Sequence, residues 1–257
     1  MSDTPLSVGG LEIETRRIAG PAHRPTLVFL HEGLGSVSMW RDFPDRLARA
    51  CGCPALLFSR AGYGASSPVA LPRPLDYMQR EGRDVLPAIL DAAGLQQAVL
   101  VGHSDGASIA LVHAGSHPGP RIRAVVVMAP HTFVEPVCLT SIQAAAAAFA
   151  TGDLRPRLRR HHGDNVDCAF WGWNRAWLDP GFRTWDIRPY LSAVTAPVLA
   201  IQGDDDEYGT IAQVEAVRAG VPAGARTLLL PDCGHSPHRD QPEQVLRAIA
   251  GFLADGP

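Results

Sequence analysis

The chain has 257 residues, of which 46% are hydrophobic and 19% charged, and its formal net charge at pH 7 is −3. Its ample apolar content excludes a mainly disordered chain, and without a basic excess we expect no nucleic acid partner. All 23 basic residues are arginine, which excludes chemistry that requires a lysine, such as Schiff-base formation.

The five cysteines are scattered along the chain. Cys51 and Cys53 are separated by one residue, which fits neither a zinc knuckle nor a redox pair. Free thiols are the simplest interpretation, and they favour a reducing compartment. Residues 1–10 lack the features of a signal peptide, and no run of about 18 apolar residues is present to span a membrane. We therefore expect a cytoplasmic protein with no membrane partner, whose oligomeric state the sequence leaves open.

Short, continuous apolar runs alternate with amphipathic segments of helical length. Such runs are typical of strands buried on both faces of a parallel sheet. Strands are predicted at Thr26–His31, Ala55–Ser59, Ala98–His103, Arg123–Pro130, Pro197–Gly203 and Arg226–Asp232, and helices at Met39–Ala50, Leu75–Ala93, Ala107–Ser116, Ile211–Ala219 and Pro242–Leu253. The alternating segment Leu11–Ile18 is expected to add an antiparallel edge strand. This order predicts an α/β fold with a mostly parallel sheet flanked by helices.

One long interval interrupts the alternation. Residues 131–195 show no strand pattern and contain four of the five tryptophans. An insertion of this length between two strands predicts a helical lid that packs on the main body. The predicted organisation is therefore a core of residues 1–130 and 196–257 with a lid of residues 131–195.

The third predicted strand runs directly into Gly102-His103-Ser104-Asp105-Gly106, and a helical pattern follows. This is a G-x-S-x-G motif between a strand and a helix, where the serine lies on a sharp turn that requires small neighbours. Ser104 is therefore the predicted nucleophile. The backbone N–H of Asp105, at the start of the helix, is expected to face a developing oxyanion, and its side chain is expected to be structural.

A serine hydroxyl needs a base, and that base needs a carboxylate to fix its tautomer. His235 follows the last predicted strand, and His238 is its competitor, interpreted as a surface residue or a neighbour of the site. The acids of Asp204–Glu207 all follow the fifth predicted strand, at the edge of the sheet where α/β sites lie. These residues alone do not select one acid.

The elbow motif and the order of serine, acid and histidine resemble the α/β-hydrolase family. The resemblance extends from Leu27 to Leu253, nearly the whole chain. It implies that Asp206, three residues after the strand-terminal glycine, is the acid. His31–Ser36 is similar to the family's H-G-x-x-G loop, which implies that Gly33 supplies the second oxyanion N–H.

The sequence departs from the family at Glu32, where the usual residue is glycine. We expect its carboxylate to face the cleft and to contact a polar substrate group, a water molecule or a lid residue. Ser59–Ser66 resembles another loop of the family, D-x-R-G-x-G-x-S, for which a structural role is expected.

The resemblance implies a serine hydrolase that acts on an ester or thioester of a small carboxylic acid through an acyl-enzyme. A serine at position 104 excludes the family branches that use an aspartate nucleophile. The alternatives are a C–C bond hydrolase of aromatic ring-cleavage products and a non-catalytic receptor or interaction protein. No glycine-rich dinucleotide motif or metal-spaced histidine set is present, so we expect no cofactor and no metal. The expected partner is a small-molecule acyl substrate.

The predicted lid contains two further groups of interest. Trp171, Trp173 and Trp177 are expected either to pack the lid on the body or to form an apolar wall for the substrate. Arg155, Arg157, Arg159, Arg160, His161 and His162 form a basic cluster. It is interpreted as a solvated helix face, with a phosphate-binding patch for coenzyme A as the alternative.

Overall fold

The computed structural model describes residues 4–255, and its centre is a seven-stranded sheet of order β3-β5-β4-β6-β7-β8-β9. Strand β3 is antiparallel to β5, and the other neighbours are parallel. The strands are β3 Thr15–Ile18, β4 Thr26–Leu30, β5 Ala55–Phe58, β6 Ala98–His103, β7 Ile122–Met128, β8 Val198–Gly203 and β9 Arg226–Leu230. Residues 1–3 and 256–257, the ends of the predicted core, lie outside the described residues.

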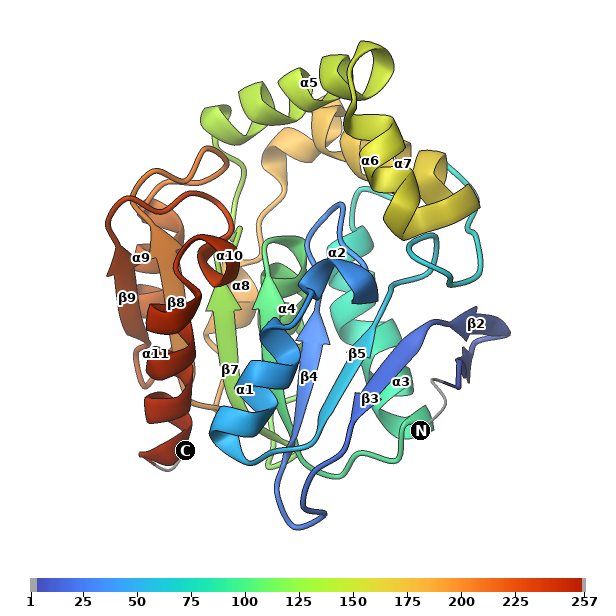
Figure 1. Ribbon diagram of the computed structural model, residues 1–257. Helices are drawn as coiled ribbons and strands as arrows, with labels where there is room; N and C mark the ends of the chain where they lie inside the picture. Colours follow the sequence, from blue (N-terminus) through green and yellow to red (C-terminus); the bar gives the residue numbers. More distant parts are fainter. Residues whose placement is uncertain (1–3, 256–257) are drawn as a thin grey trace.

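Helices cover both faces of the sheet (Figure 1). They are α1 Phe43–Cys51, α2 Tyr77–Arg80, α3 Leu86–Ala92, α4 Asp105–Ser116, α5 Pro136–Thr151, α6 Leu154–His162, α7 Val166–Leu178, α8 Arg188–Leu191, α9 Ala212–Gly220, α10 Pro237–Asp240 and α11 Pro242–Ala254. Four shorter helical segments are η1 Val37–Trp40, η2 Glu81–Val85, η3 Gly163–Asn165 and η4 Pro180–Thr184. Helices α1 and α11 pack on one face, and α3, α4 and α9 pack on the other.

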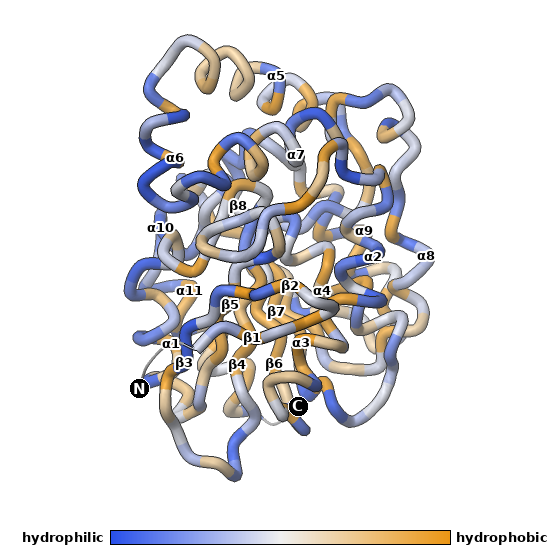
Figure 2. Tube along the Cα trace, turned by 90° about the vertical axis from the view of Figure 1, so that its right-hand side faces the viewer, coloured by the Kyte–Doolittle hydropathy of each residue, from blue (hydrophilic) through white to orange (hydrophobic). Residues whose placement is uncertain are grey.

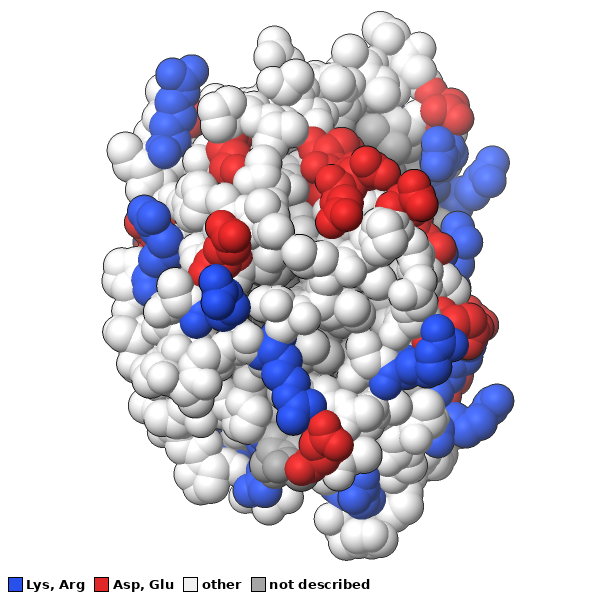
Figure 3. All heavy atoms as spheres, turned by 90° about the vertical axis from the view of Figure 1, so that its left-hand side faces the viewer, with Lys and Arg blue, Asp and Glu red and all other residues white. Residues whose placement is uncertain are grey.

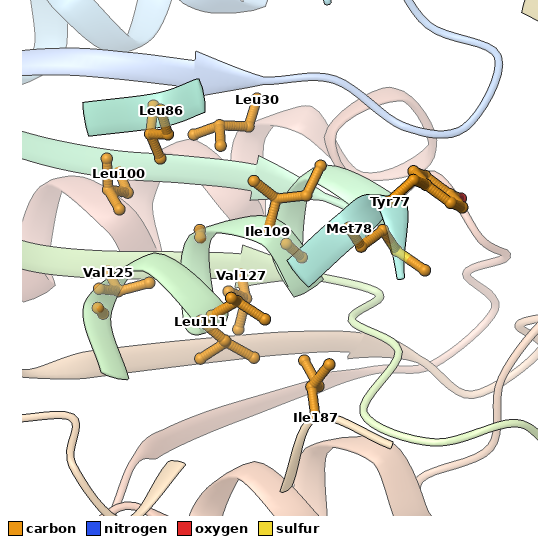
Figure 4. Close-up of a cluster of buried hydrophobic side chains, with 14 of the residues drawn as sticks. Leu30, Tyr77, Met78, Leu86, Leu100, Ile109, Leu111, Val125, Val127 and Ile187 are labelled. Atoms are coloured by element: carbon orange, nitrogen blue, oxygen red, sulfur yellow. The ribbon is translucent and has the colours of Figure 1, made fainter. Parts of the chain in front are cut away.

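The strands are apolar at every position because both of their faces are buried. Val99 and Val101 of β6 pack toward α1 and α11, whereas Leu100 between them packs toward α4, as the two-residue period of a strand requires. Figure 4 shows the α4 side, where Leu100, Val125 and other strand residues face Ile109 and Leu111. In Figure 2 the strands are accordingly among the most hydrophobic parts of the chain.

The predicted fold class is confirmed, and each of the six predicted core strands is present. The predicted edge segment is divided into two strands. Its second half, Thr15–Ile18, forms the antiparallel edge of the sheet, whereas Leu11–Ile13 (β2) pairs with Leu6–Val8 (β1) in a separate hairpin.

The predicted helix Leu75–Ala93 is present but irregular. Its central segment η2 has a wider, π-helical turn, as expected where Pro87 lacks an N–H to donate to the carbonyl of Arg83. Two histidines contact backbone carbonyls of η2. His113 Nδ1, on α4, is 3.0 Å from Gly82 O, and His117 Nε2, just after α4, is 2.8 Å from Arg83 O. These two histidines therefore have a structural role.

The interval of residues 131–195 is helical, as predicted, except for an isolated bridge between Phe133 and Asp186. Helices α5, α6 and α7 lie above the carboxyl ends of the strands (Figure 1). Helix α8, in the same interval, instead packs on α4 and α9 of the main body. Within residues 4–255 no single helix is long and apolar enough to cross a membrane, although α5 and the α6–α7 segment, bent by 88°, pass the length and composition criteria together.

On the face shown in Figure 3, acidic and basic side chains are interspersed, and the most compact charged group is acidic. The basic side chains of this face therefore lie among acidic ones.

Candidate active site

Ser104 lies on a strained turn between β6 and α4. Its φ and ψ are 53° and −119°, a backbone conformation that residues other than glycine rarely adopt. The turn also needs close backbone contacts: a Cβ on Gly102 would clash with the carbonyl of Gly106, and one on Gly106 would clash with the carbonyl of Leu30. The two glycines of the motif thus allow the serine hydroxyl to lie at the carboxyl end of a central strand.

Three side chains that are distant in sequence form one hydrogen-bonded series at this point. Ser104 Oγ lies 2.9 Å from His235 Nε2, and His235 Nδ1 lies 2.8 and 3.0 Å from the two carboxylate oxygens of Asp206. Because an ionised carboxylate only accepts, Nδ1 carries the proton. The lone pair on Nε2 is then free to accept the serine proton.

Asp206 is held in place by its surroundings. Its oxygens accept hydrogen bonds from Gln202 Nε2 and from the N–H of Tyr208, each at 2.8 Å. Burial alone would raise the pKa of Asp206, but the hydrogen bonds from His235 and Tyr208 outweigh it and lower the pKa below its ordinary value. The carboxylate therefore stays ionised beside the imidazole.

The competing acids lie elsewhere. Asp204 and Asp205 are exposed, and Glu207 accepts a hydrogen bond from the backbone N–H of His235 at 3.2 Å. Of the four acids, Asp206 is the one whose carboxylate contacts the His235 ring.

His238 is not on the surface, and that option of the sequence interpretation is wrong. The side chain is 3% exposed, and its ring lies 4.9 Å from the Trp40 ring and 4.8 Å from the His103 ring. The short helix α10 turns it inward against these aromatic groups. It is a buried neighbour of the site.

The two predicted oxyanion donors are the backbone amides of Gly33 and Asp105. Asp105 is the first residue of α4, so its N–H has no helical carbonyl partner. The carbonyl of Glu32 accepts a hydrogen bond from Arg60 Nη2 at 2.9 Å and lies 2.7 Å from His31 Nδ1. Since a trans peptide points its N–H opposite to its C=O, the N–H of Gly33 is directed away from these two residues. Gly33 and Asp105 both line the same cavity as Ser104.

The side chain of Glu32 also lines this cavity. It contacts Arg239 Nη2 at 3.3 Å and His103 Nδ1 at 3.5 Å. Burial would raise the pKa of Glu32, but these two neighbours hold it well below its ordinary value. Glu32 is not among the described residues with a positive φ, so the loop does not need glycine here. A contact between Glu32 and a lid residue was one of the expected possibilities. It is wrong, because Arg239 and His103 both belong to the main body.

The side chain of Asp105 is buried and structural, as its position predicts. It accepts a hydrogen bond from Tyr77 OH at 2.5 Å and lies 3.7 Å from Arg60 Nη2. Tyr77 OH in turn accepts a hydrogen bond from Trp177 Nε1 at 3.1 Å. Burial raises the pKa of Asp105, against the opposing effect of Arg60. This series connects helix α7 to the residue that follows Ser104.

A cavity of about 550 Å³ opens above Ser104, within the size range of small-molecule sites. Trp173 and Trp177 line it, and a Cβ on Gly33 would clash with the Trp173 ring. Trp171 does not line the cavity, so its expected place in the wall is wrong. It faces another side of α7, where its ring packs on Phe149 and Phe170.

The structure adds residues that the sequence interpretation missed. His131 is buried in the cavity wall, with its ring 5.7 Å from the His235 ring. Burial, and then the nearby charge of His235, lowers the pKa of His131 to about 3, so it is neutral at pH 7. The ring of Tyr208 lies 4.6 Å from the His235 ring. His131 follows the fourth predicted strand directly, which is the signal that could have identified it.

The predicted basic cluster is divided between several roles. Arg155 pairs with Asp167, and His162 bridges to the body, accepting from the N–H of Gly64 at 3.0 Å and donating to the carbonyl of Leu34 at 2.9 Å. In the part of the chain that the structure describes, no group of three or more His, Cys, Asp or Glu side chains is arranged to hold a metal ion.

Comparison with known proteins gives consistent matches. The model of the Alpha/beta hydrolase family matches residues 27–248. A carboxylesterase of Bacillus subtilis (strain 168) is 26% identical over 93% of this chain and 83% of its own length. A 2-hydroxy-6-oxononadienedioate/2-hydroxy-6-oxononatrienedioate hydrolase of Paraburkholderia phymatum is 25% identical over 95% and 92%. The solved structure of a serine hydrolase involved in carbazole degradation superposes with a TM-score of 0.77 at 18% identity, covering 98% of each chain.

Proposed function

Since this chain belongs to the alpha/beta hydrolase family and is a hydrolase, we propose that it cleaves an ester or thioester of a small carboxylic acid through an acyl-enzyme on Ser104. The observation that carries the proposal is the 2.9 Å contact between Ser104 Oγ and His235 Nε2 at a cavity of about 550 Å³. The carboxylesterase relative supports the ester as the bond cleaved.

In the proposed reaction Ser104 Oγ attacks the carbonyl carbon while His235 Nε2 takes the hydroxyl proton. Asp206 keeps the proton on Nδ1 and stabilises the imidazolium. His235 then gives its proton to the departing alcohol or thiol, and a water molecule hydrolyses the acyl-enzyme with His235 again as the base. The N–H groups of Gly33 and Asp105 bind the oxyanion, a contribution of about 2.7–4 kcal/mol per donor in comparable enzymes.

The same proposal makes residues 131–195 a lid over Ser104. Its working part is α5 to α7, which lie above the carboxyl ends of the strands (Figure 1), and Trp173 and Trp177 form its inner, apolar wall. The proposed partner is a small acyl substrate. The proposed cellular compartment is the cytoplasm.

A second candidate is hydrolysis of a C–C bond in an aromatic ring-cleavage product. One relative is named as a hydrolase of a 2-hydroxy-6-oxo dienedioate, which favours this candidate. A vinylogous diketone would then be the preferred substrate, and 4-nitrophenyl esters would give no burst of 4-nitrophenol.

A fluorophosphonate probe tests the proposal directly. It is expected to label the intact protein on Ser104, and 4-nitrophenyl acetate is expected to give a burst of 4-nitrophenol followed by steady turnover. Mass spectrometry of the labelled peptide identifies the residue. An unlabelled protein without turnover would be a receptor on this fold and would overturn the proposal.

The substitution Trp173→Ala is expected to change acyl-chain preference more than the rate on an acetate ester. Each methylene buried against the wall contributes about 0.8 kcal/mol, or about a fourfold gain in kcat/KM, and loss of the ring should reduce this gain along a series from acetate to hexanoate. Trp171→Ala is the matched control, since Trp171 lies on the same helix outside the cavity lining. Equal changes in both variants would contradict a wall role for Trp173.

A further inference from the structure

Helix α6 presents charged side chains to the cavity on the same face as its apolar residues. Leu154 and Leu158 line the cavity together with Arg157, Arg160 and His161. These positions follow the helical spacing of three and four residues, and Arg159 on the opposite side does not line the cavity. A purely solvated basic face would leave the inner stripe apolar.

Further basic residues from the main body contribute to the cavity lining. Arg41, after η1, and Arg239, on α10, line it as well. We refer to Arg41, Arg157, Arg160, His161 and Arg239 as the basic rim. It joins segments that are far apart in sequence.

Hydrogen bonds to the η1 segment hold two residues of the rim in place. His161 Nδ1 lies 2.9 Å from Ser38 Oγ, and Arg239 Nη2 donates to the carbonyl of Met39 at 3.1 Å. Burial lowers the pKa of His161, and the charges of Arg239, Arg41 and Arg160 lower it further. The positive charges thus lie close enough to act on one imidazole.

The rim has more positive charge than its neighbours neutralise. Arg239 is paired with Glu32 at 3.3 Å, and Arg157 lies 3.7 Å from Asp153. Within residues 4–255 neither Arg41 nor Arg160 forms an ion pair.

Arg41 is also held in an unusual backbone conformation. Its φ and ψ are 55° and −128°, which is strained for a residue with a side chain and is typical of functional positions. An arginine that lines the cavity, forms no ion pair and is held in a strained conformation is suited to receiving an anion.

We propose that the basic rim binds an anionic oxygen group of the substrate, a carboxylate or a phosphate, at the end remote from the scissile bond. Arg41 and Arg160 supply the unpaired guanidinium groups, and the apolar wall of Trp173 and Trp177 holds the chain between the anion and Ser104. This inference rests on the proposed function and specifies its substrate class. The anion has two possible sources: a dicarboxylic acid would carry it on the acyl side, and coenzyme A would carry it on the leaving group.

Two matched substrate pairs distinguish these sources. The first pair is 4-nitrophenyl hydrogen glutarate, which is anionic, and its neutral methyl ester. The second pair is butyryl-coenzyme A and the N-acetylcysteamine thioester of butyrate, which lacks the phosphates. Wild-type protein is expected to prefer the charged member of one pair, and the preference should decrease with added salt.

The variants Arg41→Gln and Arg160→Gln are expected to lower the charged-to-neutral ratio of kcat/KM about tenfold each, as loss of a charge-assisted contact does. Arg159→Gln is the matched control, because Arg159 lies next to Arg160 on α6 but outside the cavity lining. Unchanged ratios in both rim variants would overturn the proposal. Equal losses in the Arg159 variant would overturn it too, since they would indicate a general electrostatic field.

Calorimetric titration with glutarate or coenzyme A separates this inference from the proposed function. One outcome is that wild-type protein binds the anion, that binding weakens in the two rim variants, and that no ester or thioester is turned over. This outcome would support anion binding at the basic rim and contradict the proposed hydrolysis. Turnover without any dependence on Arg41 or Arg160 would do the reverse. Absence of both binding and turnover would reject both.

Discussion

Replacement of Ser104 by alanine is expected to lower kcat about 10⁶-fold, the scale measured where a serine nucleophile of this kind is removed. No other hydroxyl is hydrogen-bonded to His235 Nε2 among the described residues, so no neighbour can take over the attack. The residual rate would come from binding and from the two oxyanion donors. Steady-state kinetics on the best ester measures the loss, and thermal unfolding checks that the fold is kept.

A serine on the helix that follows provides the control. Ser116 lies at the end of α4, where its hydroxyl has no hydrogen-bond partner in the described part of the chain. Ser116→Ala should leave kcat unchanged. Full turnover by the Ser104→Ala variant would remove the proposed mechanism altogether.

The substitution Asp206→Asn is expected to reduce kcat by about 10⁴-fold, as loss of the correct histidine tautomer does. The asparagine amide would donate to His235 Nδ1, which lies 2.8 Å from the present Asp206 oxygen. The ring proton would then move to Nε2, where it prevents acceptance of the Ser104 proton. The pH profile of kcat/KM and the residual rate report the change.

The neighbouring acids supply the comparison. Asp204→Asn and Asp205→Asn are expected to change kcat by less than about tenfold, because exposed carboxylates in water exert weak electrostatic effects. A larger loss of kcat from Asp204→Asn than from Asp206→Asn would show that Asp206 is wrongly assigned as the acid.

The sequence predicts the sheet well because its strands are short, continuous apolar runs that alternate with amphipathic segments of helical length. It also predicts the turn at Ser104, since the motif lies between a strand and a helix. In the sequence, resemblance to the family is the signal that selects Asp206 among the four acids. What distinguishes this residue physically is its contact with the His235 ring and the donors from Gln202 and Tyr208 that hold its carboxylate. These groups converge only in the folded chain.

Other parts of the site depend on orientations that the sequence does not specify. Trp171 and Trp173 are two residues apart on α7, so they face different directions, and only the docking of the helix decides which one meets the cavity. His238 is buried because α10 turns it against Trp40. The strained backbone of Arg41 has no local signal, as neither glycine nor asparagine occupies the position.

The hydrogen bonds from Trp177 to Tyr77 and from Tyr77 to Asp105 have a consequence for substrate affinity. They secure α7 to the buried residue next to Ser104, so the folded protein already holds this wall of the cavity in its working position. The conformational entropy of ordering α7 is therefore lost during folding and not when the substrate binds. Affinity for small substrates benefits most from such preorganisation, because they have few contacts with which to offset an ordering cost.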